Sequence, residues 1–197
     1  MENTRTKTTR NSLILLLTAA IWGMAFVSQS KGMDYMHPFT FNGVRSLIGA
    51  ASILVYILIS RKIAGDKAAP LDWKLNVKAG LLCGIFLTIA STLQQFGIKY
   101  TSVGKAGFIT TLYIIFVPMF GIFLKKKVAP VVWAAAVMAA VGMYLLCMTE
   151  SLRLGAGDIM VFLCAIAFAI QIMTVDHYAA RIDGAVVSCI QFTVCGV

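Results

Sequence analysis

The sequence predicts an all-α integral membrane protein, a helical bundle whose spans cross the bilayer several times. Three observations predict this fold class. Hydrophobic residues make up 59% of the chain and charged residues only 13%, and the mean hydropathy is +0.86. Apolar runs of about 20 residues recur along the chain, and each is long enough to cross the ~30 Å hydrocarbon core as a helix. An ordinary soluble domain is therefore excluded.

Six apolar runs are long enough to be full spans, and a seventh begins near the end of the sequence. The predicted spans are 11–30, 39–60, 78–98, 103–124, 128–148 and 157–175, followed by 185–197. The seventh run has about 13 apolar residues, or ~20 Å of helix, and is too short to cross. We therefore expect the chain to be truncated within the seventh span and to be the first part of a longer protein.

Basic residues divide unequally between the two sides of these spans. When the loops are assigned alternately from the N-terminus, twelve basic residues fall on one side and four on the other, with Arg45 inside a span. The larger group comprises Arg5, Lys7, Arg10, Arg61, Lys62, Lys67, Lys74, Lys78, Lys125, Lys126, Lys127 and Arg181. This positive-inside pattern predicts a cytoplasmic N-terminus in the cell (inner or plasma) membrane. It also makes Lys125, Lys126 and Lys127 a cytoplasmic anchor.

Small and polar residues follow one face of most predicted spans, as expected where helices associate in a bilayer. In span 78–98 these are Gly80, Gly84, Thr88, Ser91 and Gln95. Corresponding faces carry Asn42, Arg45, Gly49, Ser52 and Tyr56; Thr18, Trp22, Ala25 and Gln29; Gly107, Thr111 and Pro118; and Cys164, Phe168 and Gln171. Span 128–148 has almost no polar group in its middle. We expect it at the periphery, while the other spans share a polar interior and the glycines serve close packing.

Arg45 and Pro118 are the least ordinary residues within the predicted spans. An arginine at the bilayer centre costs about 2.5–3.5 kcal/mol on insertion scales, so it faces a partner or a wet cavity. Arg45 lies in the outer third of its span, where snorkelling lowers that cost, so both a cavity role and a structural role remain open. Pro118 removes a helical hydrogen bond and clashes with the preceding turn, which predicts a bend there. The five cysteines lack metal-type spacing and are expected to pack as small apolar side chains.

An internal repeat links the start of the chain to its last third. The segment "LTAAIWGMAFVS" (17–28) aligns with "LCAIAFAIQIMT" (163–174). Leu17 and Ala19 meet identical residues, and Trp22 and Ser28 meet similar ones. A repeat of five spans has an odd number of spans, so its second copy must be inverted in the membrane. Inverted repeats are common among secondary transporters. The predicted domains are a first five-helix repeat over 1–148 and an incomplete, inverted second repeat over 149–197.

The sequence resembles the EamA-type family of the drug/metabolite transporter superfamily over nearly its whole length. The matching pieces are "AAIWGMAFV" (19–27), "HPFTFNGVRSLIGA" (37–50), "QQFGIKYTSVGKAGFITTLYIIFVPMFGIFL" (94–124), "VVWAAAVMAAVGMYLL" (131–146) and "GDIMVFLCAIAFAIQ" (157–171). The resemblance implies ten spans in two inverted five-span halves around a central pocket. The positions it implies for that pocket are Trp22, Asn42, Arg45, Gln95, Thr111 and Tyr113, to which the polar face of span 157–175 adds Gln171. Many members carry an acidic residue after the fourth span, where this chain has three lysines, so no role of that acid is transferred.

The leading hypothesis is a secondary transporter or exporter of small polar metabolites, amino-acid-like or drug-like, that works by alternating access. The alternatives are a non-transporting assembly or sensor module, or a non-functional fragment of the transporter. An enzyme is disfavoured because His37 and His177 lie in loops on opposite sides and form no dyad. No nucleotide-binding loop is present, and no metal or cofactor is expected. The expected partners are a small-molecule substrate and the lipid bilayer, with a homodimer left open and no nucleic acid.

Overall fold

The computed structural model describes residues 2–64, 71–123, 129–147 and 155–197, and within these ranges the regular structure is all helical. The helices are α1 (Glu2–Gly32), α2 (Pro38–Ala64), α3 (Trp73–Tyr100), α4 (Val103–Thr111), α5 (Tyr113–Phe123), α6 (Pro130–Cys147), α7 (Ala156–Tyr178) and α8 (Gly184–Gly196). Among the described residues, five segments are long and apolar enough to cross a membrane, namely Asn11–Gly32, Pro38–Ile63, Trp73–Tyr100, Val103–Phe123 and Ala156–Tyr178. The predicted all-α integral membrane fold is confirmed, and the inverted repeat stays a prediction.

Two of the predicted spans are shorter than the rest in the described part of the chain. Predicted span 128–148 corresponds to α6, which has 18 residues, or about 27 Å of helix. Both of its predicted end residues lie outside the described residues. The seventh run forms α8, a helix of 13 residues, which is too short to cross the ~30 Å hydrocarbon core.

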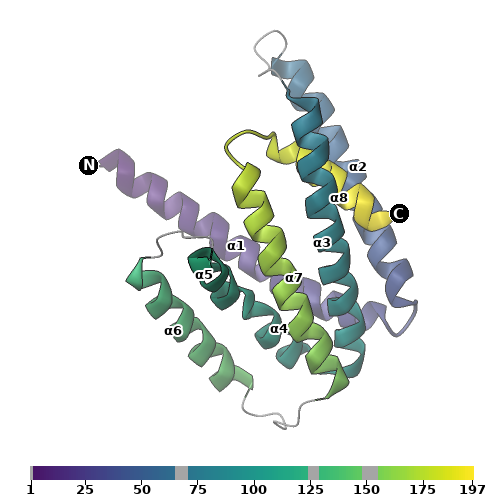
Figure 1. Cartoon of the computed structure of the whole chain (residues 1–197), viewed down its shortest axis with the longest axis vertical. Coiled ribbons are helices and arrows are strands. Elements are labelled where there is room, and N and C mark those ends of the chain that lie inside the picture. Colours follow the sequence, from purple (N-terminus) through teal and green to yellow (C-terminus); the bar gives the residue numbers. More distant parts are fainter. Residues whose placement is uncertain (1, 65–70, 124–128, 148–154) are drawn as a thin grey trace.

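Helix α3 lies between α7 and α8, and glycines set how closely these helices approach (Figure 1). A Cβ at Gly80 would lie 2.7 Å from two side-chain carbons of Ile190 in α8. At the other end of α3, a Cβ at Gly97 would lie 3.0 Å from the carbonyl oxygen of Gly157 in α7. Only glycine allows contacts this short. The prediction that glycines serve close packing is therefore confirmed for Gly80 and Gly84, whereas no described atom lies within 4 Å of a Cβ at Gly107.

Apolar side chains fill the space around α3. One buried cluster joins Ile98 of α3, Ile109 of α4 and Val161 of α7. Cys83 and Cys164 are fully buried in two further apolar clusters against α8 and α7, which confirms their predicted role as small packing residues.

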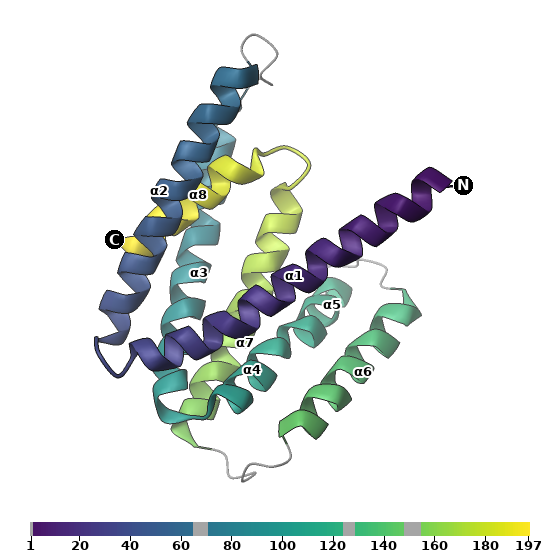
Figure 2. The same ribbon diagram turned by 180° about the vertical axis from the view of Figure 1, so that it is seen from behind.

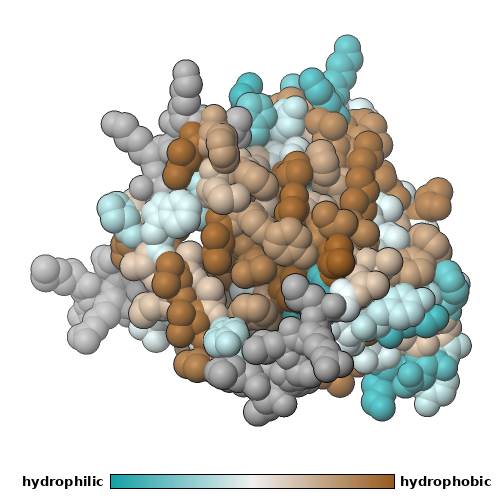
Figure 3. Space-filling model, turned by 60° about the horizontal axis from the view of Figure 1, so that its bottom comes forward, coloured by the Kyte–Doolittle hydropathy of each residue, from teal (hydrophilic) through white to brown (hydrophobic). Residues whose placement is uncertain are grey.

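Helices α1 and α6 lie at the edges of the bundle (Figures 1 and 2). Helix α6 packs against α4 and α5, so its predicted peripheral place is confirmed. The side chains of residues 11–24 in α1 are exposed, and burial begins only over residues 25–33. Many large apolar side chains are exposed, such as Leu15 at 69% exposure. Much of the face seen in Figure 3 is hydrophobic. Such a surface suits contact with lipid.

The fourth predicted span is interrupted at Leu112, between α4 and α5. The Leu112 N–H donates to the Ile109 carbonyl at 3.2 Å, and the Ile115 N–H donates to the Leu112 carbonyl at 2.9 Å. These i to i+3 bonds tighten the backbone locally. Pro118 itself lies inside α5 and is buried, so the interruption precedes the proline, and a bend at Pro118 stays a prediction.

Candidate functional site

Three helices meet at a buried polar cluster around Asn42. The Asn42 side chain is 3% exposed, and its Nδ2 donates to the Oγ of Ser91 in α3 at 2.9 Å. Cys195 of α8 places its Sγ 3.3 Å from the same Ser91 oxygen. Burying a polar group without a hydrogen-bond partner costs free energy. The hydrogen bonds among these side chains offset that cost for α2, α3 and α8 inside an apolar bundle.

Arg45 attaches a positive charge to this cluster. One of its terminal nitrogens donates to Asn42 Oδ1 at 2.8 Å, and its guanidinium carbon lies 5.8 Å from the centre of the Phe41 ring. Among the described residues Arg45 forms no ion pair. A guanidinium carries five N–H donors, so the site is chemically suited to an anionic or strongly accepting group.

A second polar group lies one turn further along α3, where α1 crosses it. The Gln95 side chain is fully buried and donates through Nε2 to the backbone carbonyl of Gln29 in α1 at 3.5 Å. Neighbouring Gln94 donates to Thr110 Oγ1 of α4 at 3.3 Å. Gln29 was predicted to lie on a polar face but not to line the pocket, and neither Gln94 nor Thr110 was predicted as a pocket residue. The feature of the sequence that could have indicated this polar group is the pair of adjacent glutamines, Gln94 and Gln95, in an apolar run.

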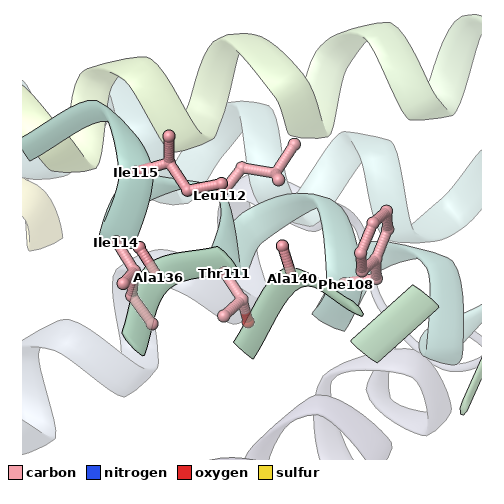
Figure 4. A pocket seen from close by; sticks show the side chains of 7 residues that line it. All are labelled: Phe108, Thr111, Leu112, Ile114, Ile115, Ala136 and Ala140. Atoms are coloured by element: carbon pink, nitrogen blue, oxygen red, sulfur yellow. The ribbon is translucent and has the colours of Figure 1, made fainter. Parts of the chain in front are cut away.

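The structure places the remaining candidates in separate surroundings. Trp22 is 52% exposed on α1, and Gln171 donates to Gln191 of α8 at 3.1 Å. Thr111 donates to the Gly107 carbonyl at 2.7 Å and faces α6 across an apolar gap of about 10 Å³, beside Ala136 (Figure 4). That gap holds at most about one water. Lys125, Lys126 and Lys127 lie outside the described residues.

Two larger hollows flank α5. One, of about 530 Å³, lies between α5, α6 and α7, and Tyr113, Pro118 and Asp176 are among its lining residues. The other, of about 620 Å³, lies between α3, α5 and α7 and ends near His177. Both are within the size range of small-molecule sites. Their walls are mostly apolar. Of the residues predicted to line the substrate pocket, Tyr113 borders one of these hollows.

Asp158, in the first turn of α7, is a buried carboxylate. It is 3% exposed and accepts hydrogen bonds from the Thr101 hydroxyl and, at 2.9 Å, from the Gly155 N–H. The Lys105 Nζ lies 3.9 Å from it. These partners are local or come from the α3–α4 turn, so the carboxylate fastens the beginning of α7 to that turn.

Comparison with known proteins agrees with this membrane architecture. The EamA-like transporter family matches residues 10–148. A protein of Archaeoglobus fulgidus described as an uncharacterized transporter is 31% identical over 171 residues, which are 84% of this chain and 48% of that protein. The chain thus spans about half the length of this curated relative. No solved structure matches it. Because the family match covers more than half of the chain and runs through α2 to α5 and their polar cluster, the chain belongs to the EamA-like transporter family.

Proposed function

We propose that the protein acts in a secondary transporter that exports small polar solutes, amino-acid-like or drug-like, by alternating access. The observation that carries the proposal is the polar group formed by Asn42, Arg45, Ser91 and Gln95 at the junctions of α3 with α1 and α2. In this proposal the protein is not an enzyme and needs no cofactor or metal.

The energetic argument starts from Arg45. A charged side chain in a span is costly, and intramembrane ionisable groups face a bundle interior or a water-filled path. Here the guanidinium is held by Asn42, and Asn42 is held by Ser91. Arg45 is thus oriented by a chain of hydrogen bonds with no carboxylate among them. This arrangement supports a role in meeting the acceptor groups of a polar solute.

Alternating access also requires one part of the bundle to move against another. Close glycine contacts hold α3 against α7 and α8, which supports treating these helices as a stationary unit. Among the α1 side chains whose burial the structure describes, the buried ones lie within residues 25–32, and the fourth span is interrupted at Leu112. We expect α1 and α4 to move relative to α3 during transport.

The same proposal includes the predicted setting of the chain. It places the protein in the cell membrane with a cytoplasmic N-terminus, with 1–148 as the first five-helix repeat and 149–197 as the start of the inverted second. A homodimer or the remaining spans of a longer protein would complete the pocket. The family match ends at residue 148, which supports this division.

Counterflow in proteoliposomes tests the proposal. Vesicles loaded with a defined mixture of unlabelled amino acids and other small metabolites are diluted into the same mixture labelled with stable isotopes, and uptake is read by mass spectrometry. We expect accumulation of at least one solute, and its loss in Arg45→Ala and Gln95→Ala variants that insert normally. Lys62→Ala, near the end of α2, is the matched control. Wild-type counterflow in both pocket variants would overturn the role of this polar group, and no counterflow by the wild type would overturn transport itself.

A further inference from the structure

Two buried carboxamide oxygens at the α1–α3 junction lack hydrogen-bond partners. They are Oε1 of Gln29 and Oε1 of Gln95, on side chains that are 5% and 0% exposed. Buried polar atoms in native proteins almost always have a partner, and an exception calls for an explanation such as a bound water, an ion or a functional role. Both exceptions in the described part of the chain fall on this one pair of facing residues.

Turning the Gln95 side-chain amide by a half-turn does not give its unpaired atom a partner. Its Nε2 donates to the Gln29 carbonyl at 3.5 Å. Turning the amide over would set its oxygen against that carbonyl and leave the nitrogen unpaired. The hydrogen bond found for the adjacent Gln94 side chain points away from this pair, from its Nε2 to Thr110 on α4. The unpaired acceptors therefore belong to the packing of α1 against α3.

A single group that satisfies both oxygens must carry at least two donors. A primary ammonium group has three N–H donors, whereas a quaternary ammonium has none. The surroundings favour an amine that belongs to a zwitterion, because Gln95 is one turn from Ser91 on α3. Ser91 is linked through Asn42 to the Arg45 guanidinium, which suits a carboxylate. The ammonium end of an amino acid thus has complementary groups on α1 and α3, and its carboxylate end has one on α2, which Asn42 links to Ser91 of α3.

We propose that Gln29 and Gln95 form the subsite that binds the primary ammonium group of an amino-acid-like solute. The inference rests on the proposed function and names the substrate class for the same site. Access comes from α1, which is exposed over residues 11–24 and partly buried over residues 25–32, the part that carries Gln29. Separation of this part of α1 from α3 exposes both oxygens, and the bound ammonium supplies the donors that the closed form lacks.

The test uses the protein in lipid nanodiscs, with each of the twenty standard amino acids and the N-trimethylated form of any that binds. The readouts are the thermal midpoint and the dissociation constant. The variants Gln29→Met and Gln95→Met keep the approximate volume and remove the unpaired oxygen. We expect both to raise the midpoint without ligand, because an unsatisfied acceptor disappears, and to weaken amino-acid binding roughly tenfold or more, as for loss of a hydrogen bond to a charged group. The trimethylated form should fail to bind the wild type.

Gln94→Met is the matched control, since Gln94 is equally buried but paired. It should lower the midpoint by orphaning Thr110 and leave the preference for a primary amine intact. The inference is overturned if Gln29→Met and Gln95→Met lower the midpoint and keep full affinity, if the trimethylated form binds as well, or if no amino acid binds the wild type. In that case, counterflow of solutes without an amine would still uphold the proposed function. Absence of any counterflow would overturn the proposed function, but the effect of the glutamine variants on the thermal midpoint could still be measured.

Discussion

The side chain of Asn76, at the beginning of α3, accepts a hydrogen bond of 2.8 Å from the backbone N–H of Asp183, which precedes α8. The two residues are 107 positions apart in the chain. Asp183 in turn accepts from the first N–H groups of α8 and lies 3.6 Å from Arg61 at the end of α2. One turn between α7 and α8 is thereby fastened to two other helices.

Replacing Asn76 by alanine should destabilise the protein by about 1–3 kcal/mol, because the Asp183 N–H would lose its buried acceptor. Asn76 is only 1% exposed, so water cannot easily take its place. Thermal unfolding in detergent measures the effect, with Lys74→Ala on the exposed side of the same helix as control. Equal midpoints for the two variants would show that the bond contributes nothing to stability.

At the opposite end of α3, Asp158→Ala should be at least as harmful. The carboxylate accepts from Thr101 and Gly155 and lies near Lys105, and hydrogen bonds to a charged group contribute about 1.5–3 kcal/mol. Thr101→Val removes one of these partners and should lower the midpoint less. A larger loss for Thr101→Val than for Asp158→Ala would contradict the view that the carboxylate is the centre of this contact.

Gly84→Ala tests the close approach of α3 and α8. The added Cβ would lie 2.8 Å from Val194 Cβ and 3.2 Å from the Gln191 Cα, so the backbone of α8 must shift. Overpacking of this kind costs about 1–3 kcal/mol. Gly107→Ala is the matched control, because no described atom lies within 4 Å of its Cβ position. If both variants unfold at the wild-type temperature, the two helices are less tightly packed than their glycines indicate.

The spacing of small residues on α3 predicted which side of the helix is buried, because that side depends only on helical periodicity. It did not predict the partners. Gly80 and Gly84 face α8, Ser91 faces α2 and α8, and Gln95 faces α1. Which helix covers a given face depends on contacts between segments that are far apart in the sequence. Asn76 and Asp183, which are 107 positions apart, are an example, and local sequence patterns do not reveal such a pair.

Two other features needed the three-dimensional arrangement. Asp158 stands at a span end, where water is the expected partner, but Gly157 lets α7 approach Tyr100 so closely that the carboxylate is buried beside Thr101. Pro118 signalled an irregular fourth span, yet the backbone tightens earlier, at Leu112. A proline predicts lost helical bonding in its own turn, and nothing in the residues around Leu112 marks the interruption.

The predicted orientation of the protein in the membrane can be tested by labelling two exposed turns. The turn before α2 and the turn before α8 lie near opposite ends of α3. The His37 ring packs 5.9 Å from the Phe96 ring near the end of α3, whereas Asp183 bonds to Asn76 near its beginning. Phe96 and Asn76 are thus about 30 Å apart along the helix. We therefore expect the turn before α2 and the turn before α8 to lie on opposite sides of the membrane.

With the excess of basic residues in the cytoplasm, the turn before α2 should be outside. In a variant whose five native cysteines are replaced by alanine, we expect Tyr35→Cys to react with a membrane-impermeant maleimide in intact cells. Ala180→Cys, in the turn before α8, should react only after the cells are opened. Gln95→Cys, at a fully buried position, serves as the unreactive control. The reverse pattern would place the N-terminus outside, and labelling of both turns in intact cells would contradict the separation along α3.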